Sequence, residues 1–178
     1  MINAYFDKLL AEGIEGCLKN QQINKKDYNS DIYKTFVDGC AEYHSDLNLF
    51  KKESVKIVDS LYKNDKSDFI IVNMIDPADY KSPNVNKSTI TFTRKRDDKS
   101  IYKITNKYKF NEVKRKDEII RHANFTNEDS EGRFVDIEKR FYSSQQQSPL
   151  NSDNRKNDNP CYVIVRKNGK YTFKYAYY

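Results

Sequence analysis

The sequence contains no tryptophan, only two histidines and three cysteines, and few glycines and prolines (five and four among 178 residues). Scarce glycine and proline exclude collagen-like and most low-complexity chains. Two histidines are too few for a histidine-rich metal site, and the glycines fit neither a phosphate-binding loop nor a nucleophile elbow. No apolar run reaches the roughly 18 residues of a membrane-spanning helix. We therefore expect no metal, no cofactor and no membrane span.

What the chain does contain favours a folded, soluble, basic protein. Its 14 tyrosines and 10 phenylalanines argue against wholesale disorder. The length is typical of one domain, so we predict a single domain over residues 1–178. The N-terminus carries a charge every few residues and has no signal-peptide pattern, which favours a cytoplasmic protein or a mature exported domain.

Charge is distributed unevenly along the chain. Residues 1–80 hold 10 Lys/Arg against 14 Asp/Glu, a net of −4, whereas residues 81–178 hold 22 against 12, a net of +10. Such asymmetry can indicate a polyanionic partner. Lysine outnumbers arginine 24 to 8, however, and nucleic-acid recognition relies mainly on arginine. A solvated, lysine-rich surface is therefore the favoured interpretation.

The first third of the chain shows helical periodicity. Apolar residues recur at three- and four-residue spacing over 2–19, over about 30–46 and over about 49–63, which predicts three helices. Cys17 and Cys40 fall on the first two of these helices. If the two helices pair antiparallel, the thiols could form a disulfide, and the alternative is a pair of small buried residues.

From residue 68 onward the pattern is that of strands. A buried strand is predicted at 69–75, a hairpin at 87–95 and 100–110, and a second hairpin at 161–167 and 170–178 around Asn168-Gly169. Residues 113–122 could extend the preceding strand or form a short basic helix, 124–132 fit a loop, and 133–143 fit a strand better than a helix. Residues 143–160 are predicted to form a long polar loop. The fold prediction is α+β, with about three helices packed on a mostly antiparallel sheet of five or six strands.

Alternation in the first hairpin predicts one core face and one wet face. We expect Thr89, Thr91, Thr93, Lys103, Thr105, Lys107 and Lys109 on the wet face. Lys103, Lys107, Lys109, Thr91 and Thr93 are the predicted contacts with a partner protein, expected to be acidic. In the second hairpin, we expect the face with Tyr162, Ile164 and Phe173 to be the core side, and Arg166 to contact Tyr171 by a cation–π interaction.

No constellation of residues specifies a reaction, and we predict a non-catalytic protein-binding module of the inhibitor, toxin-neutralising or secretion-accessory type. One alternative is a nucleic-acid-binding protein that uses the basic residues of the 94–121 region. Another is a small enzyme with Cys40 and His44, or with His122, Asp117 and Glu118. The cations of the nucleic-acid alternative are Arg94, Lys95, Arg96, Lys114, Arg115 and Lys116.

Overall fold

The computed structural model describes residues 1–20, 46–75, 87–111, 113–114, 116–142 and 160–177. The chain divides into two compact units, Met1–Lys63 and Asn64–Tyr178, and each is described by itself. The described residues form helices and one antiparallel sheet of six strands, which confirms the predicted α+β class. The prediction of a single domain stays a prediction.

The first unit contains helix α1 (Ile2–Asn20) and a helix over 46–57 that continues as the π-helix η2 (Val58–Tyr62). Phe6 of α1 and Phe50 of the second helix are fully buried, and the Lys51 ammonium donates to the Asp7 carboxylate at 2.5 Å. These two predicted helices are confirmed. The helix predicted at about 30–46 lies outside the described residues, as does Cys40, so the disulfide with Cys17 stays a prediction.

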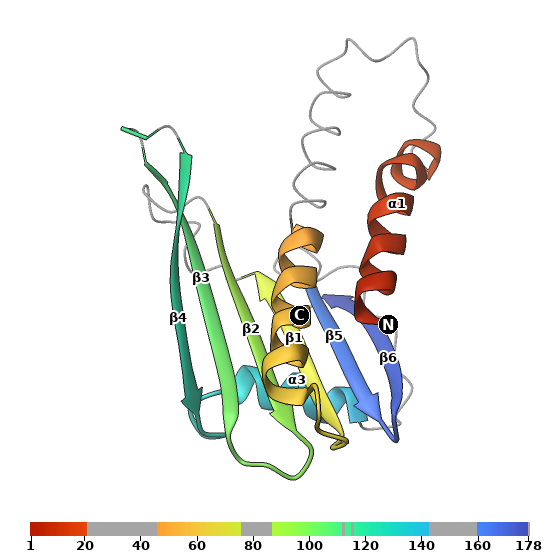
Figure 1. The fold of residues 1–178 in the computed structure, drawn as a ribbon, viewed down its shortest axis with the longest axis vertical. Coiled ribbons are helices and arrows are strands. Elements are labelled where there is room, and N and C mark those ends of the chain that lie inside the picture. The colour runs from red at the N-terminus through yellow and green to blue at the C-terminus, as the bar shows by residue number, and fades with distance from the viewer. Residues whose placement is uncertain (21–45, 76–86, 112, 115, 143–159, 178) are drawn as a thin grey trace, which may run out of the picture. The chain divides into compact units, whose positions relative to one another are not determined.

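The second unit is built on the sheet, whose strand order is β4-β3-β2-β1-β5-β6 (Figure 1). Its strands are β1 (Phe69–Ile75), β2 (Lys87–Lys95), β3 (Ile101–Asn111), β4 (Lys116–Thr126), β5 (Pro160–Lys167) and β6 (Lys170–Tyr177). All seven residues of β1 are buried, and β1 pairs antiparallel with β2 on one side and β5 on the other. A strand that is buried on both faces has a nearly continuous apolar sequence, and this pattern in residues 69–75 predicts β1.

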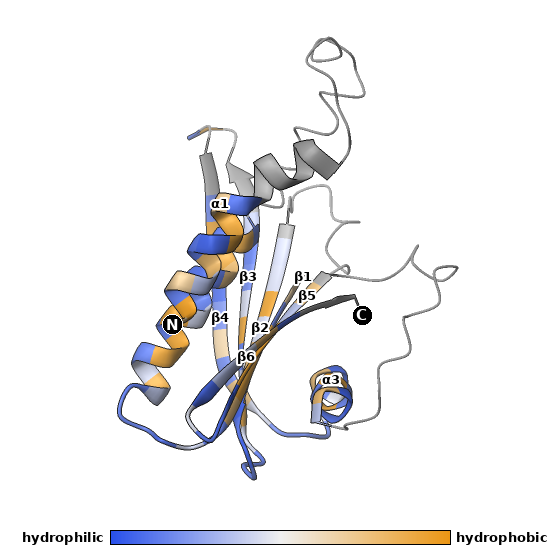
Figure 2. Cartoon of the chain, turned by 90° about the vertical axis from the view of Figure 1, so that its right-hand side faces the viewer, coloured by the Kyte–Doolittle hydropathy of each residue, from blue (hydrophilic) through white to orange (hydrophobic). Residues whose placement is uncertain are grey.

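Helix α3 (Gly132–Tyr142) packs on one face of this sheet, seen end-on in Figure 2. We call this side the α3 face. Its core joins Phe134 and Ile137 of the helix to alternate residues of the central strands, and the Phe92 and Phe134 rings lie 5.4 Å apart, centroid to centroid. The strand residues of this core are Ile70, Val72, Met74, Ile90, Phe92, Ile101, Cys161, Val163 and Val165.

The prediction of a strand at 133–143 is therefore wrong. Phe134, Ile137 and Phe141 recur at helical spacing, so one side of a helix can bury all three. A turn precedes the helix and is stabilised by the Asn127 side chain, whose Oδ1 accepts a hydrogen bond from the Ser130 amide at 2.9 Å. Residues 116–122, for which strand and helix were both open, are in strand β4, and β4 continues to Thr126, so the loop predicted at 124–132 begins only after that residue.

The C-terminal hairpin has the predicted register: Lys167 lies opposite Lys170, Ile164 opposite Phe173 and Tyr162 opposite Tyr175. Asn168 (φ 50°) and Gly169 (φ 75°) both adopt the left-handed conformation that a two-residue turn of this kind requires.

The expected division of this hairpin into a core face and an outer face is wrong. Tyr162 and Ile164 are buried, but Val163 and Val165 are buried too, in the core under α3. The Arg166 guanidinium lies 4.4 Å from the centroid of the Phe69 ring, and Arg166 is the direct cross-strand neighbour of Tyr171. Its Nε donates to the Ser67 carbonyl at 3.1 Å, which fixes the segment that leads into β1.

Gly169 offers a test of the turn, with Gly132 as a matched control. A Cβ added at either glycine meets no atom within 4 Å, so only backbone conformation differs between them. Gly169→Ala should lower the free energy of unfolding by about 1 kcal/mol, because alanine is strained at positive φ. Gly132→Ala, at the start of α3, should leave it unchanged or raise it slightly. Urea denaturation of both variants measures the difference, and equal effects would contradict the turn assignment.

Candidate functional site

The predicted contact surface on the first hairpin does not exist as one face. Register places Phe92 opposite Lys103 and Thr91 opposite Ile104, so Thr91 and Thr93 lie on the face opposite Lys103 and Lys107. The side chain of Lys109 lies outside the described residues. Thr91 and Thr93 are also only 1% exposed. Their hydroxyls are used internally: Thr91 donates to the Asn73 side chain at 2.9 Å and Thr93 to the Ile70 carbonyl at 2.8 Å. The expectation of a wet threonine face is wrong.

Lys103 and Lys107 of that prediction lie on the α3 side of the sheet. The Lys103 ammonium donates to the Glu131 carboxylate at 2.9 Å and lies 5.5 Å from the centroid of the Phe92 ring. Lys107 is half-buried and lies opposite Ile120 of β4, and Lys109 takes the strand position opposite Glu118. Lys103 therefore supports the contact between α3 and the sheet.

The basic residues considered for nucleic acid are paired within the chain wherever their side chains are described. Lys95 forms an ion pair with Asp65, Arg96 with Asp68 at 3.7 Å, and Lys114 with Glu118 at 2.8 Å. The hydrogen bond from Lys95 holds the pKa of Asp65 well below its usual range, and the Ser67 hydrogen bonds lower it further. The side chains of Arg115 and Lys116 lie outside the described residues.

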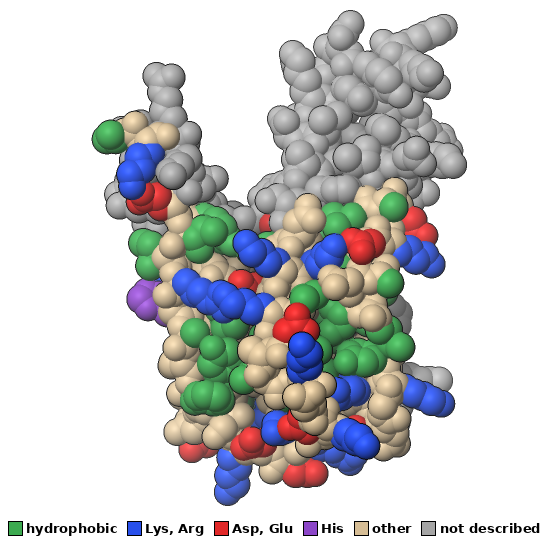
Figure 3. Space-filling model, viewed as in Figure 1, with side chains coloured by type: hydrophobic (Ala, Val, Ile, Leu, Met, Phe, Trp, Pro, Cys, Tyr) green, Lys and Arg blue, Asp and Glu red, His purple; other side chains and the backbone are tan. Residues whose placement is uncertain are grey.

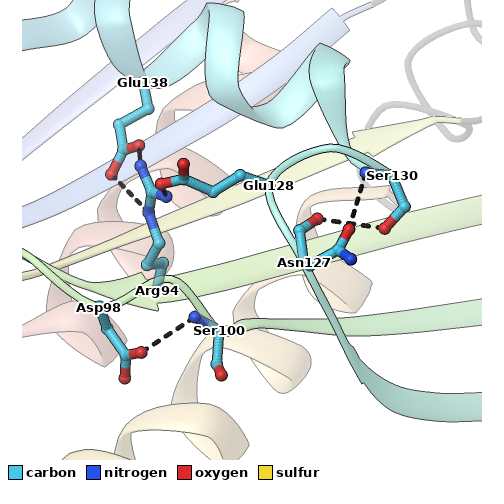
Figure 4. Close-up of polar contacts among 7 residues, drawn as sticks. All are labelled: Arg94, Asp98, Ser100, Asn127, Glu128, Ser130 and Glu138. Carbon is cyan, nitrogen blue, oxygen red and sulfur yellow. Dashed lines mark hydrogen bonds and ion pairs between the residues drawn. The ribbon is translucent and has the colours of Figure 1, made fainter.

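Arg94 is the most enclosed of these cations (Figure 4). It binds Glu138 of α3 through two nitrogens, with Nε donating to Oε1 at 3.2 Å, and it also pairs with Glu128. The side chains of Arg94 and Glu138 are 11% and 8% exposed, and the guanidinium lies 5.7 Å from the centroid of the Phe134 ring. A two-point pair of this kind fixes orientation as well as distance, so it sets α3 on the sheet.

The catalytic candidates are not brought together by the described structure. Glu118 and His122 are four residues apart on one strand, a separation of about 13 Å, and the side chain of Asp117 lies outside the described residues. Cys40 and His44 lie outside the described residues. Cys161 is buried in the α3 core, where burial raises the pKa of its thiol to about 12, so it is a poor nucleophile.

Neither a metal site nor a membrane-crossing helix emerges from the described ranges. No three His, Cys, Asp or Glu side chains gather there as metal ligands would. None of the helices described is both long and apolar enough to cross a membrane.

Sequence reasoning left strand β4 open and missed its position at the edge of the sheet. It pairs with β3 along its whole length, from Asn111 opposite Lys116 to Ile101 opposite Thr126, and it has no other neighbour among the described strands. Residues 119–125 are all exposed, including Ile119 (56%), Ile120 (46%) and Phe125 (65%). We call the outward side of residues 118–126 the β4 edge. Hydrophobic side chains are visible among charged ones along this side of the sheet in Figure 3.

The two edges of the sheet differ in chemistry. An edge strand presents unpaired amides and carbonyls, and proteins usually protect it with lysine, proline or a short length. Strand β6 carries exposed Lys170 and half-buried Lys174. Strand β4 is longer, has no proline and exposes three large apolar side chains, of which Phe125 rests on Tyr102 at 4.9 Å between ring centroids. Continuous exposure of β4 on both faces could have been predicted only if β4 had been known to be an edge strand.

Comparison with protein-family models, with curated proteins and with solved structures finds no match to this chain.

The Arg94 pair can be tested with Glu138→Gln and Glu128→Gln. Loss of the buried Glu138 charge should lower the free energy of unfolding by about 2 kcal/mol, because it leaves the enclosed guanidinium with one partner. Glu128 is 45% exposed, and its substitution should cost less than about 1 kcal/mol. Chemical denaturation measures both values, and an equal loss in the two variants would contradict the buried role of Glu138.

The Cys161 thiol should resist modification in the folded protein. In a Cys17→Ser/Cys40→Ser chain, a thiol reagent at pH 8 should label Cys161 no faster than the protein unfolds, but at once in denaturant. Because folding raises this pKa from 9.0 to about 12, its stabilising contribution is complete below pH 9 and is lost as pH rises toward 12. Rapid labelling of the native protein would contradict this burial.

Proposed function

We propose that this chain is a non-catalytic protein-binding module and that the β4 edge is its contact surface. In this mode of recognition a partner strand adds to the exposed edge of a sheet, so main-chain hydrogen bonds supply affinity and side-chain contacts supply specificity. Inhibitory, toxin-neutralising and secretion-accessory roles can each use such an edge.

The observation that carries this proposal is the exposure of Ile119, Ile120 and Phe125 on a strand with one free side among the described strands. A partner strand would cover apolar surface on both faces, because Ile120 and His122 point to the α3 face and Ile119 and Phe125 to the other. Lys107 is the cross-strand neighbour of Ile120 on β3, so it borders the edge.

Support for the two alternatives is weaker. A phosphate backbone needs available cations, and Arg94, Lys95, Arg96 and Lys114 each pair with a carboxylate of the chain. An enzyme needs a nucleophile or base in convergent geometry, and the spacing of Glu118 and His122 offers none.

Affinity capture from native extract tests the proposal. The wild-type chain should retain one or more proteins specifically, and Ile119→Lys/Phe125→Lys should release them, because two charges on the edge oppose strand addition. Thr172→Lys is the matched control, since it adds a lysine at an exposed position of the other edge strand. Thermal unfolding of each variant verifies that it is folded. Retention of the same proteins by the β4 variant would contradict the use of this edge.

A further inference from the structure

We infer that a groove on the first unit binds an acidic amphipathic helix of another protein. The groove has a volume of about 750 Å³ and runs along the helix over 46–57 and its continuation η2, beside Asn3 of α1. All of its described lining residues belong to the unit Met1–Lys63. The inference therefore goes beyond the proposed function and does not depend on the β4 edge.

The shape of the groove suits a second helix. Its lining residues on the helix recur at three- and four-residue spacing from Asn48 to Ser60, as one stripe of a helix does. This stripe is roughly 18 Å long, which corresponds to about three turns of a partner helix. An amphipathic helix that lies in a groove of another protein is a common mode of recognition.

The lysines of this stripe favour an acidic partner. Lys51 donates to the Asp7 carboxylate of α1 at 2.5 Å, so its charge is paired within the unit. Lys52 and Lys56 are exposed, and neither forms a hydrogen bond or an ion pair within the part of the chain that the structure describes. They differ in this respect from Lys95 and Lys114, which pair with carboxylates.

The spacing of the two lysines specifies how a partner could meet them. Residues four apart on a helix are neighbours on its surface, so Lys52 and Lys56 form one positive patch. Two glutamates four apart on a partner helix form a negative patch of the same size. Asp59 is the one carboxylate of the described lining, so positive charge prevails in the groove.

The lining is mostly apolar in spite of these charges. Half-buried Val55 belongs to the same stripe, and the stems of Lys52 and Lys56 add aliphatic surface below their charged ends. A purely acidic tail would use only the charges. An amphipathic helix with an apolar residue between its carboxylates could cover Val55 and pair with both lysines.

An anionic membrane surface fits the groove less well. Helices that lie on membranes bury a broad apolar face, and Val55 is the one large apolar side chain of the described lining. Asp59 would also be repelled by anionic lipid head groups.

Fluorescence anisotropy with the full chain and three labelled helical peptides tests the inference. The first peptide carries glutamates four apart around a leucine, the second has lysine in place of each glutamate, and the third has serine in place of each leucine. The first peptide should bind, and the other two should bind about tenfold more weakly or not at all. Carbodiimide cross-linking should join its carboxylates to Lys52 or Lys56.

Charge reversal in the groove provides the sharpest comparison. Lys52→Glu/Lys56→Glu should weaken binding of the acidic peptide by about tenfold or more and should gain affinity for the basic peptide, which loss of the fold would not produce. Lys99→Glu/Lys170→Glu is the matched control, since it makes the same change in net charge at two exposed positions of the second unit. This control should retain most of the affinity for the acidic peptide, and circular dichroism verifies that both variants are folded.

Three results would each overturn the inference. They are failure of the acidic amphipathic peptide to bind at low salt, equal binding of the basic peptide, and an equal loss of affinity in the groove variant and its control. Binding to phosphatidylserine vesicles but not to the acidic peptide, with loss in Lys52→Glu/Lys56→Glu, would also overturn it and assign the groove to a membrane surface.

Discussion

The pairing of β1 with β5 is the constraint on which the rest of the second unit depends. It joins residues about a hundred positions apart, such as Phe69 and Arg166, and it puts the fully buried strand β1 in the interior of the sheet. Because β5 occupies one side of β1, the succession β2, β3 and β4 can grow only outward on the other side. The exposure of β4 is thus a consequence of the strand order, in which β4 pairs with β3 and with no other described strand.

A second consequence concerns the charge of the basic part of the chain. The α3 face is not purely apolar where the helix lies, since Arg94 and Lys103 rise from it and meet Glu138 and Glu131. Each of these cations contacts an aromatic ring as well as a carboxylate, unlike a solvated surface charge. Arg94 lies over the Phe134 ring and Lys103 over the Phe92 ring. The positive excess of residues 81–178 is therefore a poor guide to a polyanion site, because part of it joins the helix to the sheet.

Sequence alone predicted the elements whose signals are local. The Asn168-Gly169 turn determines its own register because two residues with positive φ leave a single way to pair the strands. The connection 96–100 between β2 and β3 has no such signature, so the face occupied by Thr91 relative to Lys103 was not determined by alternation within each strand. Residues 133–142 were misassigned because Phe134, Val135, Ile137 and Phe141 fit both periods, and only packing against Phe92 selects the helix. No local pattern in residues 116–126 could identify β4 as an edge, since that property belongs to the whole sheet.

The difference between the two edges bears on how far association can proceed. A sheet with two adhesive edges would add copies without limit, as in cross-β assemblies. Here the apolar edge is β4, and the opposite edge carries Lys170 and Lys174. A partner that covers β4 would leave the lysine-bearing strand β6 as the remaining edge of the described sheet. Exposed isoleucines and a phenylalanine on an unprotected edge strand are an aggregation hazard, and the proposed binding of a partner at the β4 edge would cover them.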